Sequence, residues 1–145
     1  MKKVLVIGGG AMGSAFTVPC LDNNNKVTIT EPYNKKFIQD LSSKNKFHSS
    51  LKINLSKKLK FKKFSKDLFK EKFDLIVIAL SLSGIDFIGN ELKITKVKAP
   101  ILVLTKGLKY EKKKNKVFTI SEKLKKNYNL TNISVLKGPC LAKEL

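Results

Sequence analysis

Residues 8–13, GGGAMG, have the types and spacing needed to bind a pyrophosphate. They fit the pattern G-x-G-x-x-G, in which Gly8 makes a tight turn, Gly10 lets the backbone approach phosphates without a Cβ, and Gly13 allows close helix packing. The N-terminus of the following helix offers N–H groups and a partial positive charge. The motif stands between an apolar run and a segment of helical character, so it predicts a dinucleotide-binding turn.

An acidic residue, Glu31, follows the next apolar run about 20 residues beyond the glycines, where a ribose-binding carboxylate belongs. Such a carboxylate accepts hydrogen bonds from the adenosine ribose and repels a 2′-phosphate. The neighbouring Lys35 and Lys36 would instead attract a 2′-phosphate, and a solvated carboxylate at a strand end is the simpler alternative. NAD or NADP is therefore the expected cofactor, with NAD slightly favoured by the local charge.

Two more groups of residues follow later apolar runs, at strand ends where open α/β sheets bind ligands. Lys106 stands in TKG after ILVL, and a cation there can neutralise a cofactor or substrate oxygen; a solvated lysine is the alternative. Gly138 and Cys140 stand in GPCLAKEL after ISVL, at a turn that leads toward a helix. Cys140 is not expected to be a nucleophile, because the single histidine, His48, is far away in sequence.

The segments that must position these residues alternate between apolar runs and helical patterns, as βαβ units do. The expected strands are 4–7, 27–30, 74–80, 101–104 and 133–136, with a weaker one at 58–62. The expected helices are 11–21, 34–43, 65–72, 85–92 and 117–127, and 45–56 is expected to be irregular or partly extended. The predicted fold class is α/β, a Rossmann-like, doubly wound, mostly parallel sheet with helices on both faces.

Length and composition indicate one domain, 1–145, because 145 residues with 42% hydrophobic content suffice for one core. No run approaches the ~20 apolar residues of a membrane span, and no signal-peptide cleavage pattern is present. Cys20 and Cys140 are far apart and lack C-x-x-C spacing, so neither a metal site nor a disulfide framework is indicated. We expect a soluble, cytoplasmic protein.

The net charge of +19 would ordinarily suggest a polyanion partner. All 30 basic residues are lysine, however, and arginine is the residue suited to bidentate recognition of phosphate and guanine. The lysines are also spread along the chain without interleaved aromatic residues. A solvated lysine-rich surface is therefore expected rather than specific nucleic-acid binding, which would show a steep salt dependence.

Taken together, the motifs resemble the N-terminal domain of NAD(P)-dependent glycerol-3-phosphate dehydrogenases. The resemblance covers nearly the whole chain, through GGGAMGSA, FDLIVIALS, APILVLTKGL and VLKGPCLAKEL. TKG followed by GP-x-x-A-K-E makes it specific, because many dinucleotide-binding domains share only the glycine motif. It implies an oxidoreductase that transfers hydride between NAD(P)H and dihydroxyacetone phosphate, a small phosphorylated substrate. The product, sn-glycerol 3-phosphate, feeds glycerophospholipid synthesis.

Residue by residue, the resemblance implies cofactor contacts at Ala11, Met12 and Ala142. It also implies that Lys106 contacts both cofactor and substrate and acts in catalysis, where a cation stabilises negative charge developing on the ketone oxygen. Gly138 and Cys140 match positions near the substrate.

The chain departs from the family pattern at four positions that bear on substrate identity. An aromatic residue is replaced by Met12, a proline by Ser81, a serine by Lys137, and a hydroxyl or amide residue by Cys140. The family's helical C-terminal domain, with a second catalytic lysine and most of the phosphate pocket, is absent from 1–145. We therefore expect this chain alone to be inactive, and a full-length form to be able to form a homodimer.

Two other functions stay open at this stage. One is a stand-alone NAD-binding module without catalysis. The other is a different two-domain dehydrogenase, such as a 3-hydroxyacyl-CoA or 2-hydroxyacid type, against which the TKG and GPCLAKEL elements argue.

Overall fold

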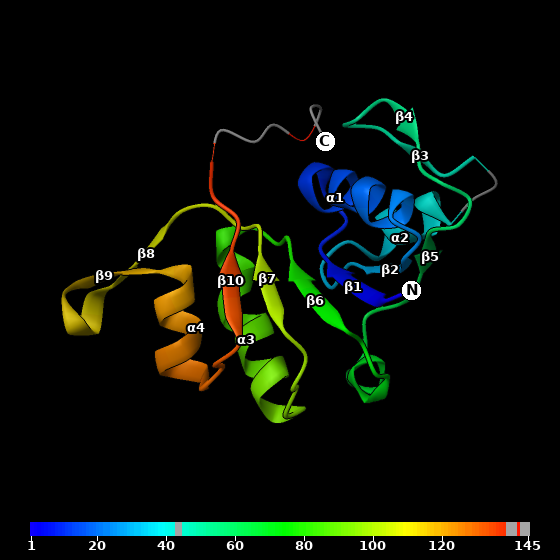
Figure 1. The fold of residues 1–145 in the computed structure, drawn as a ribbon. Helices are drawn as coiled ribbons and strands as arrows, with labels where there is room; N and C mark the ends of the chain where they lie inside the picture. The colour runs from blue at the N-terminus through cyan, green and yellow to red at the C-terminus, as the bar shows by residue number, and fades with distance from the viewer. Residues whose placement is uncertain (43–44, 139–141, 143–145) are drawn as a thin grey trace.

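A six-stranded parallel sheet forms the centre of the molecule (Figure 1). This computed structural model describes residues 1–42, 45–138 and 142. The strand order is β10-β7-β6-β1-β2-β5, so the chain winds outward from β1 in both directions and the sheet is doubly wound. The strands are β1 (Lys3–Ile7), β2 (Lys26–Thr30), β5 (Lys60–Phe61), β6 (Leu75–Ile78), β7 (Ile101–Val103) and β10 (Ile133–Val135).

Helices and two small hairpins connect these strands. The α-helices are α1 (Ala11–Asp22), α2 (Lys35–Leu41), α3 (Ile85–Ile94) and α4 (Ile120–Tyr128). Short 3-10 helices cover Lys66–Lys70, Leu82–Gly84 and Lys112–Lys114. The antiparallel hairpins pair β3 (Phe47–His48) with β4 (Ile53–Asn54), and β8 (Leu108–Glu111) with β9 (Lys116–Thr119). None of the described helices has both the length and the apolar character needed to cross a membrane.

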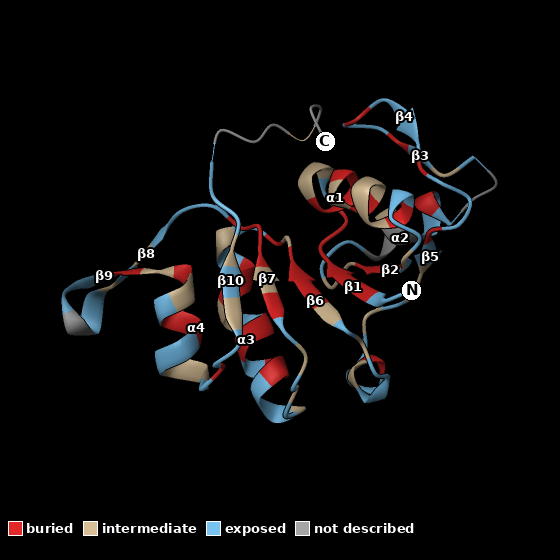
Figure 2. Cartoon of the chain, viewed as in Figure 1, coloured by how far each residue is buried: buried red, intermediate tan, exposed pale blue. Residues whose placement is uncertain are grey.

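The four central strands, β2, β1, β6 and β7, are mostly buried on both faces, which explains why they are rich in apolar and β-branched residues (Figure 2). In β1, Leu5 and Ile7 point into a core completed by residues of α3 and α4. The alternate residues Val4 and Val6 point into a second core, against α1 and α2. The predicted Rossmann-like sheet with helices on both faces is confirmed.

Two of the expected helices differ from the structure. Segment 65–72 forms only the 3-10 turn Lys66–Lys70, and the first residues of 117–127 belong to β9. Val117 and Phe118 pair with β8, as β-branched and aromatic residues favour. The helix then begins at Ile120, because Thr119 and Glu122 form a capping box with reciprocal side-chain-to-backbone hydrogen bonds.

Candidate functional site

The glycine turn, residues 8–13, joins β1 to α1, and at two of its positions a side chain would overlap backbone atoms. Gly8 has a φ of +115°, and a Cβ there would lie 2.4 Å from the Ala79 carbonyl oxygen. A Cβ on Gly13 would lie 2.0 Å from the carbonyl oxygen of Gly8. At Gly10, in contrast, a Cβ would meet nothing within 4 Å. A Cβ on Gly9 would lie 2.4 Å from the Phe37 ring. Three of the four glycines are thus enclosed by neighbouring atoms, whereas Gly10 leaves open space beside the helix N-terminus.

Glu31 lies directly beside this turn, at the carboxyl end of β2. Its Oε2 accepts a hydrogen bond from the Gly9 N–H at 2.8 Å, and its Oε1 accepts one from the Tyr33 N–H at 2.9 Å. The carboxylate is therefore held in place by two backbone donors. Its predicted contact with a ribose stays a prediction. Lys35 and Lys36 begin α2, and the positions of their side chains lie outside what the structure describes.

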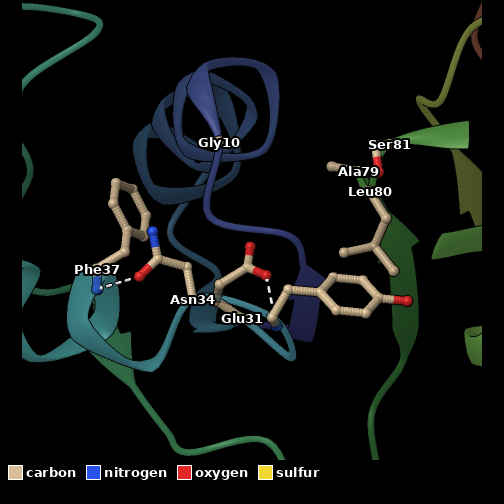
Figure 3. A pocket seen from close by; sticks show the side chains of 8 residues that line it. Gly10, Glu31, Asn34, Phe37, Ala79, Leu80 and Ser81 are labelled. Atoms are coloured by element: carbon tan, nitrogen blue, oxygen red, sulfur yellow. Dashed lines mark hydrogen bonds between the residues drawn. The ribbon is translucent and has the colours of Figure 1, made fainter. Parts of the chain in front are cut away.

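A cavity of about 300 Å³ opens between the glycine turn, the end of β2, α2 and the end of β6 (Figure 3). It lies where the sheet order reverses between β1 and β6, the usual ligand site of an open α/β sheet. We call it the Glu31 cavity. Its lining residues are Gly10, Glu31, Tyr33, Asn34, Phe37, Ala79, Leu80 and Ser81.

Lys106 and Gly138 lie together at the carboxyl ends of the neighbouring strands β7 and β10. The Lys106 ammonium donates a hydrogen bond to the Gly138 carbonyl oxygen at 3.2 Å, although 32 residues separate them. Next to Lys106, the buried Thr105 hydroxyl donates to the Leu80 carbonyl oxygen at 2.8 Å and ties the end of β7 to the end of β6. The side chain of Lys106 itself is exposed to solvent.

For the remaining residues predicted to contact cofactor or substrate, the structure gives only their position and burial, or does not describe them. Ala11 is the first residue of α1 and is half-buried, and Met12 packs partly against the core on the α1 side of the sheet. Ala142 is a half-buried residue in a turn, and Cys140 lies outside the described residues. The cofactor and substrate roles of these residues therefore stay predictions.

A family model described as "NAD-dependent glycerol-3-phosphate dehydrogenase N-terminus" matches residues 3–145. The chain belongs to this family. A search of curated protein sequences finds no match. The family assignment agrees with the resemblance inferred from the TKG and GPCLAKEL motifs, and it identifies the chain with an N-terminal domain of oxidoreductases that use a nicotinamide cofactor.

Solved structures show the same fold. Glycerol-3-phosphate dehydrogenase from Coxiella burnetii has a TM-score of 0.80 at 18% identity, covering 99% of this chain and 42% of that one. The Plasmodium falciparum glycerol-3-phosphate dehydrogenase has a TM-score of 0.79, with the same identity and coverage. A putative 2-dehydropantoate 2-reductase from Enterococcus faecalis scores 0.62 at 20% identity, covering 92% and 40%. The chain thus spans 42% of the length of both dehydrogenases.

Sequence reasoning missed one residue of the site in this member of the family, His48. Its side chain is fully buried, and its Nε2 lies 3.1 Å from the Gly9 carbonyl oxygen in the glycine turn. The Ser14 hydroxyl donates to the same oxygen at 2.9 Å. No periodic pattern marks segment 45–56, so the only signals were a lone histidine and a small polar residue after the motif.

A cluster around Asp86 on α3 holds the segment that follows Lys106. The carboxylate lies 2.7 Å from the Lys123 ammonium on α4 and 3.3 Å from that of Lys109 on β8. The Tyr128 hydroxyl donates to it at 2.9 Å. Desolvation and this hydrogen bond raise the pKa of Tyr128 to about 12. Desolvation acts against ionisation of Asp86, but its three hydrogen-bond donors outweigh it and lower the pKa of this carboxyl.

Proposed function

We propose that the chain is the cofactor-binding domain of a glycerol-3-phosphate dehydrogenase and that it binds NAD(H) at the glycine turn. The observation that carries this proposal is the contrast within the turn. Neighbouring backbone atoms occupy the space where a side chain on Gly8 or Gly13 would lie. Gly10, in contrast, faces open space and lines the Glu31 cavity. A pyrophosphate placed there would meet the N-terminal N–H groups of α1.

Titration with NADH tests this proposal. Gly10→Val would place a branched side chain in the space needed by the pyrophosphate, so binding should be lost without loss of fold. Gly10→Ala serves as the matched control, since its single methyl group should weaken binding less. Undiminished NADH binding by Gly10→Val would contradict the assignment.

We further propose that NAD is preferred over NADP. The support is the Glu31 carboxylate, which lines the cavity and is held by two backbone donors. A fixed negative charge there repels a 2′-phosphate and can accept hydrogen bonds from ribose hydroxyls. Dissociation constants for NADH and NADPH provide the test, and Glu31→Gln should reduce the preference. Tighter binding of NADPH would instead favour a role for Lys35 and Lys36.

For the full-length protein we propose hydride transfer between NAD(P)H and dihydroxyacetone phosphate or sn-glycerol 3-phosphate, in glycerophospholipid synthesis. The cofactor would supply or accept the hydride. The Lys106 cation would stabilise charge on the substrate oxygen, with Gly138 and Cys140 nearby. The side chain of Lys106 is exposed, and the chain spans 42% of the length of the Coxiella burnetii and Plasmodium falciparum enzymes, which supports a further helical domain as the other wall of the site.

An NADH-oxidation assay with dihydroxyacetone phosphate tests this activity. We expect negligible turnover by this chain, since one wall of a site does not position a substrate or exclude water. A version that extends through the proposed helical domain should turn over, and Lys106→Ala in that version should abolish the activity. Robust turnover by the short chain would contradict the need for a second domain.

The remaining proposals concern partners and location. The partner would be a small phosphorylated substrate, without specific nucleic acid, and the full-length form would be able to form a homodimer. A reducing, cytoplasmic location fits the spacing of Cys20 and Cys140, which lacks the pattern of a disulfide framework. Titration with DNA and RNA oligonucleotides at several salt concentrations, and mass measurement of the longer protein in solution, test these points.

A further inference from the structure

The β3–β4 hairpin brings His48 against the glycine turn from a distant part of the chain. The imidazole is fully buried and lies edge-on to the Phe37 ring, with centroids 5.2 Å apart. Phe37 in turn fills the space beside Gly9, where a Cβ would meet its ring at 2.4 Å. The turn is thus enclosed by α2 and the hairpin on the side where Gly9 lies.

The hydrogen bonds of His48 assign the tautomer of its ring. The Leu51 N–H donates to Nδ1 at 3.2 Å, so Nδ1 must carry a lone pair. In the neutral ring the proton is then on Nε2, which donates to the Gly9 carbonyl oxygen at 3.1 Å. The tight turn from His48 to Leu51 therefore selects the tautomer that can bind the glycine turn.

The Gly9 carbonyl is held by two donors, His48 Nε2 and the Ser14 hydroxyl. This carbonyl and the Gly10 N–H belong to one planar trans peptide, so the two groups point in opposite directions. Because the carbonyl is directed toward His48 and Ser14, the Gly10 N–H is directed away from them. Gly10 lines the Glu31 cavity, where the pyrophosphate is proposed to bind.

We propose that His48 is a positioning residue for the cofactor, which holds the Gly9–Gly10 peptide so that its N–H faces the pyrophosphate. This inference rests on the proposed function. Glu31 already holds the Gly9 N–H at 2.8 Å, so His48 completes the restraint of this residue from the other side. Pre-orientation of a donor lowers the cost of binding, because less freedom is lost when the ligand arrives.

Two substitutions separate the hydrogen bond from the volume of the ring. His48→Leu fills similar space without a donor, and we expect it to raise the Kd for NADH about tenfold, the effect of one net hydrogen bond. His48→Gln retains a side-chain N–H donor and should restore the Kd to within about threefold of wild type. Ile88→Val, in the core on the opposite face of the sheet, serves as the control for general destabilisation and should leave the Kd unchanged.

Because the chain has a single histidine, ¹⁵N-labelled histidine yields one imidazole spectrum. We expect the Nε2–H tautomer in the free chain and a shift of its resonances on saturation with NADH. This measurement needs no variant, so it stands even where His48→Leu fails to fold.

The outcomes distinguish this inference from the proposed function. Wild-type protein that does not bind NADH would overturn both. Wild-type protein that binds NADH, together with an unchanged Kd in His48→Leu or an imidazole spectrum insensitive to NADH, would overturn only the role of His48. An equal loss of affinity in Ile88→Val would also overturn it, because the effect would then follow from stability alone.

Discussion

The glycine turn and the Lys106 segment lie at the same edge of the sheet but are built in different ways. At the turn, backbone atoms fill the positions beside Gly8 and Gly13, and buried groups bind the Gly9 carbonyl. At the other end, Lys106 is exposed and donates to the carbonyl of Gly138. Close packing of this kind pre-forms a binding surface, whereas an exposed lysine needs further groups around it to act on a substrate.

The supports of the two regions differ in the same way. The turn depends on the absence of side chains, while the hairpin β8–β9 that follows Lys106 is joined to α3 and α4 through the charges around Asp86. The outer face of this hairpin leaves Leu108, Tyr110 and Val117 exposed. Substitutions in the turn should therefore act through steric overlap, and those near Lys106 through electrostatics.

The largest effect is expected for Gly13→Val. Its Cβ would overlap the Gly8 carbonyl oxygen, a backbone atom that cannot move without separating α1 from β1. We expect a loss of about 3 kcal/mol or more in the free energy of unfolding, measured with urea. Gly10→Val should cost far less, because open space surrounds that position. Equal stability of the two variants would contradict this account of the turn.

A medium effect is expected for Asp86→Asn. The Lys123 side chain is only 9% exposed and would lose the carboxylate that compensates its charge. We expect a loss of about 1–3 kcal/mol in the free energy of unfolding. The matched control is Asp67→Asn, which removes a fully exposed pair with Lys70 and should leave the free energy of unfolding nearly unchanged. Similar costs for both variants would show that the Asp86 cluster does not stabilise the fold.

A smaller, pH-dependent effect is expected for Tyr128→Phe. The hydroxyl has a pKa of about 12 in the folded chain, against about 10 when unfolded. A raised pKa stabilises the fold below the unfolded value, and that stability is lost as the pH rises from about 10 to about 12. The stability difference between wild type and variant should therefore shrink over this range in urea titrations. The exposed Tyr110→Phe is the control, and a pH-independent difference for Tyr128→Phe would contradict the prediction.

The smallest effect on stability is expected for Lys106→Ala. This side chain is exposed, so its loss should change the free energy of unfolding by no more than about 0.5 kcal/mol. Thermal unfolding of the short chain tests this directly. A cost as large as that of Asp86→Asn would show that Lys106 supports the fold, and would weaken its assignment to catalysis.

Much of the fold followed from local patterns. The unbroken apolar runs at β1, β6 and β7, with the β-branched run at β2, predicted a buried parallel sheet, because strands covered on both faces need no polar alternation. The start of α4 also depends on local residues, because Thr119 and Glu122 form its capping box. The helical pattern of 117–127 nevertheless predicted a start that is too early by three residues. The antiparallel pairing of β8 with β9 was missed, because both strands have only four residues. Leu108–Glu111 (LKYE) does alternate apolar and polar residues, but Lys116–Thr119 (KVFT) does not.

By itself, the sequence determined the doubly wound sheet, the glycine turn and the position of Lys106 after a strand, because each depends on neighbouring residues and their spacing. Only the tertiary structure decided which distant groups meet. His48 reaches Gly9 across 39 residues, and Tyr128 reaches Asp86 across 42. Such contacts depend on how hairpins and helices dock against the sheet. This docking is determined by the packing of the whole core, which cannot be inferred from the periodicity of apolar residues within one segment.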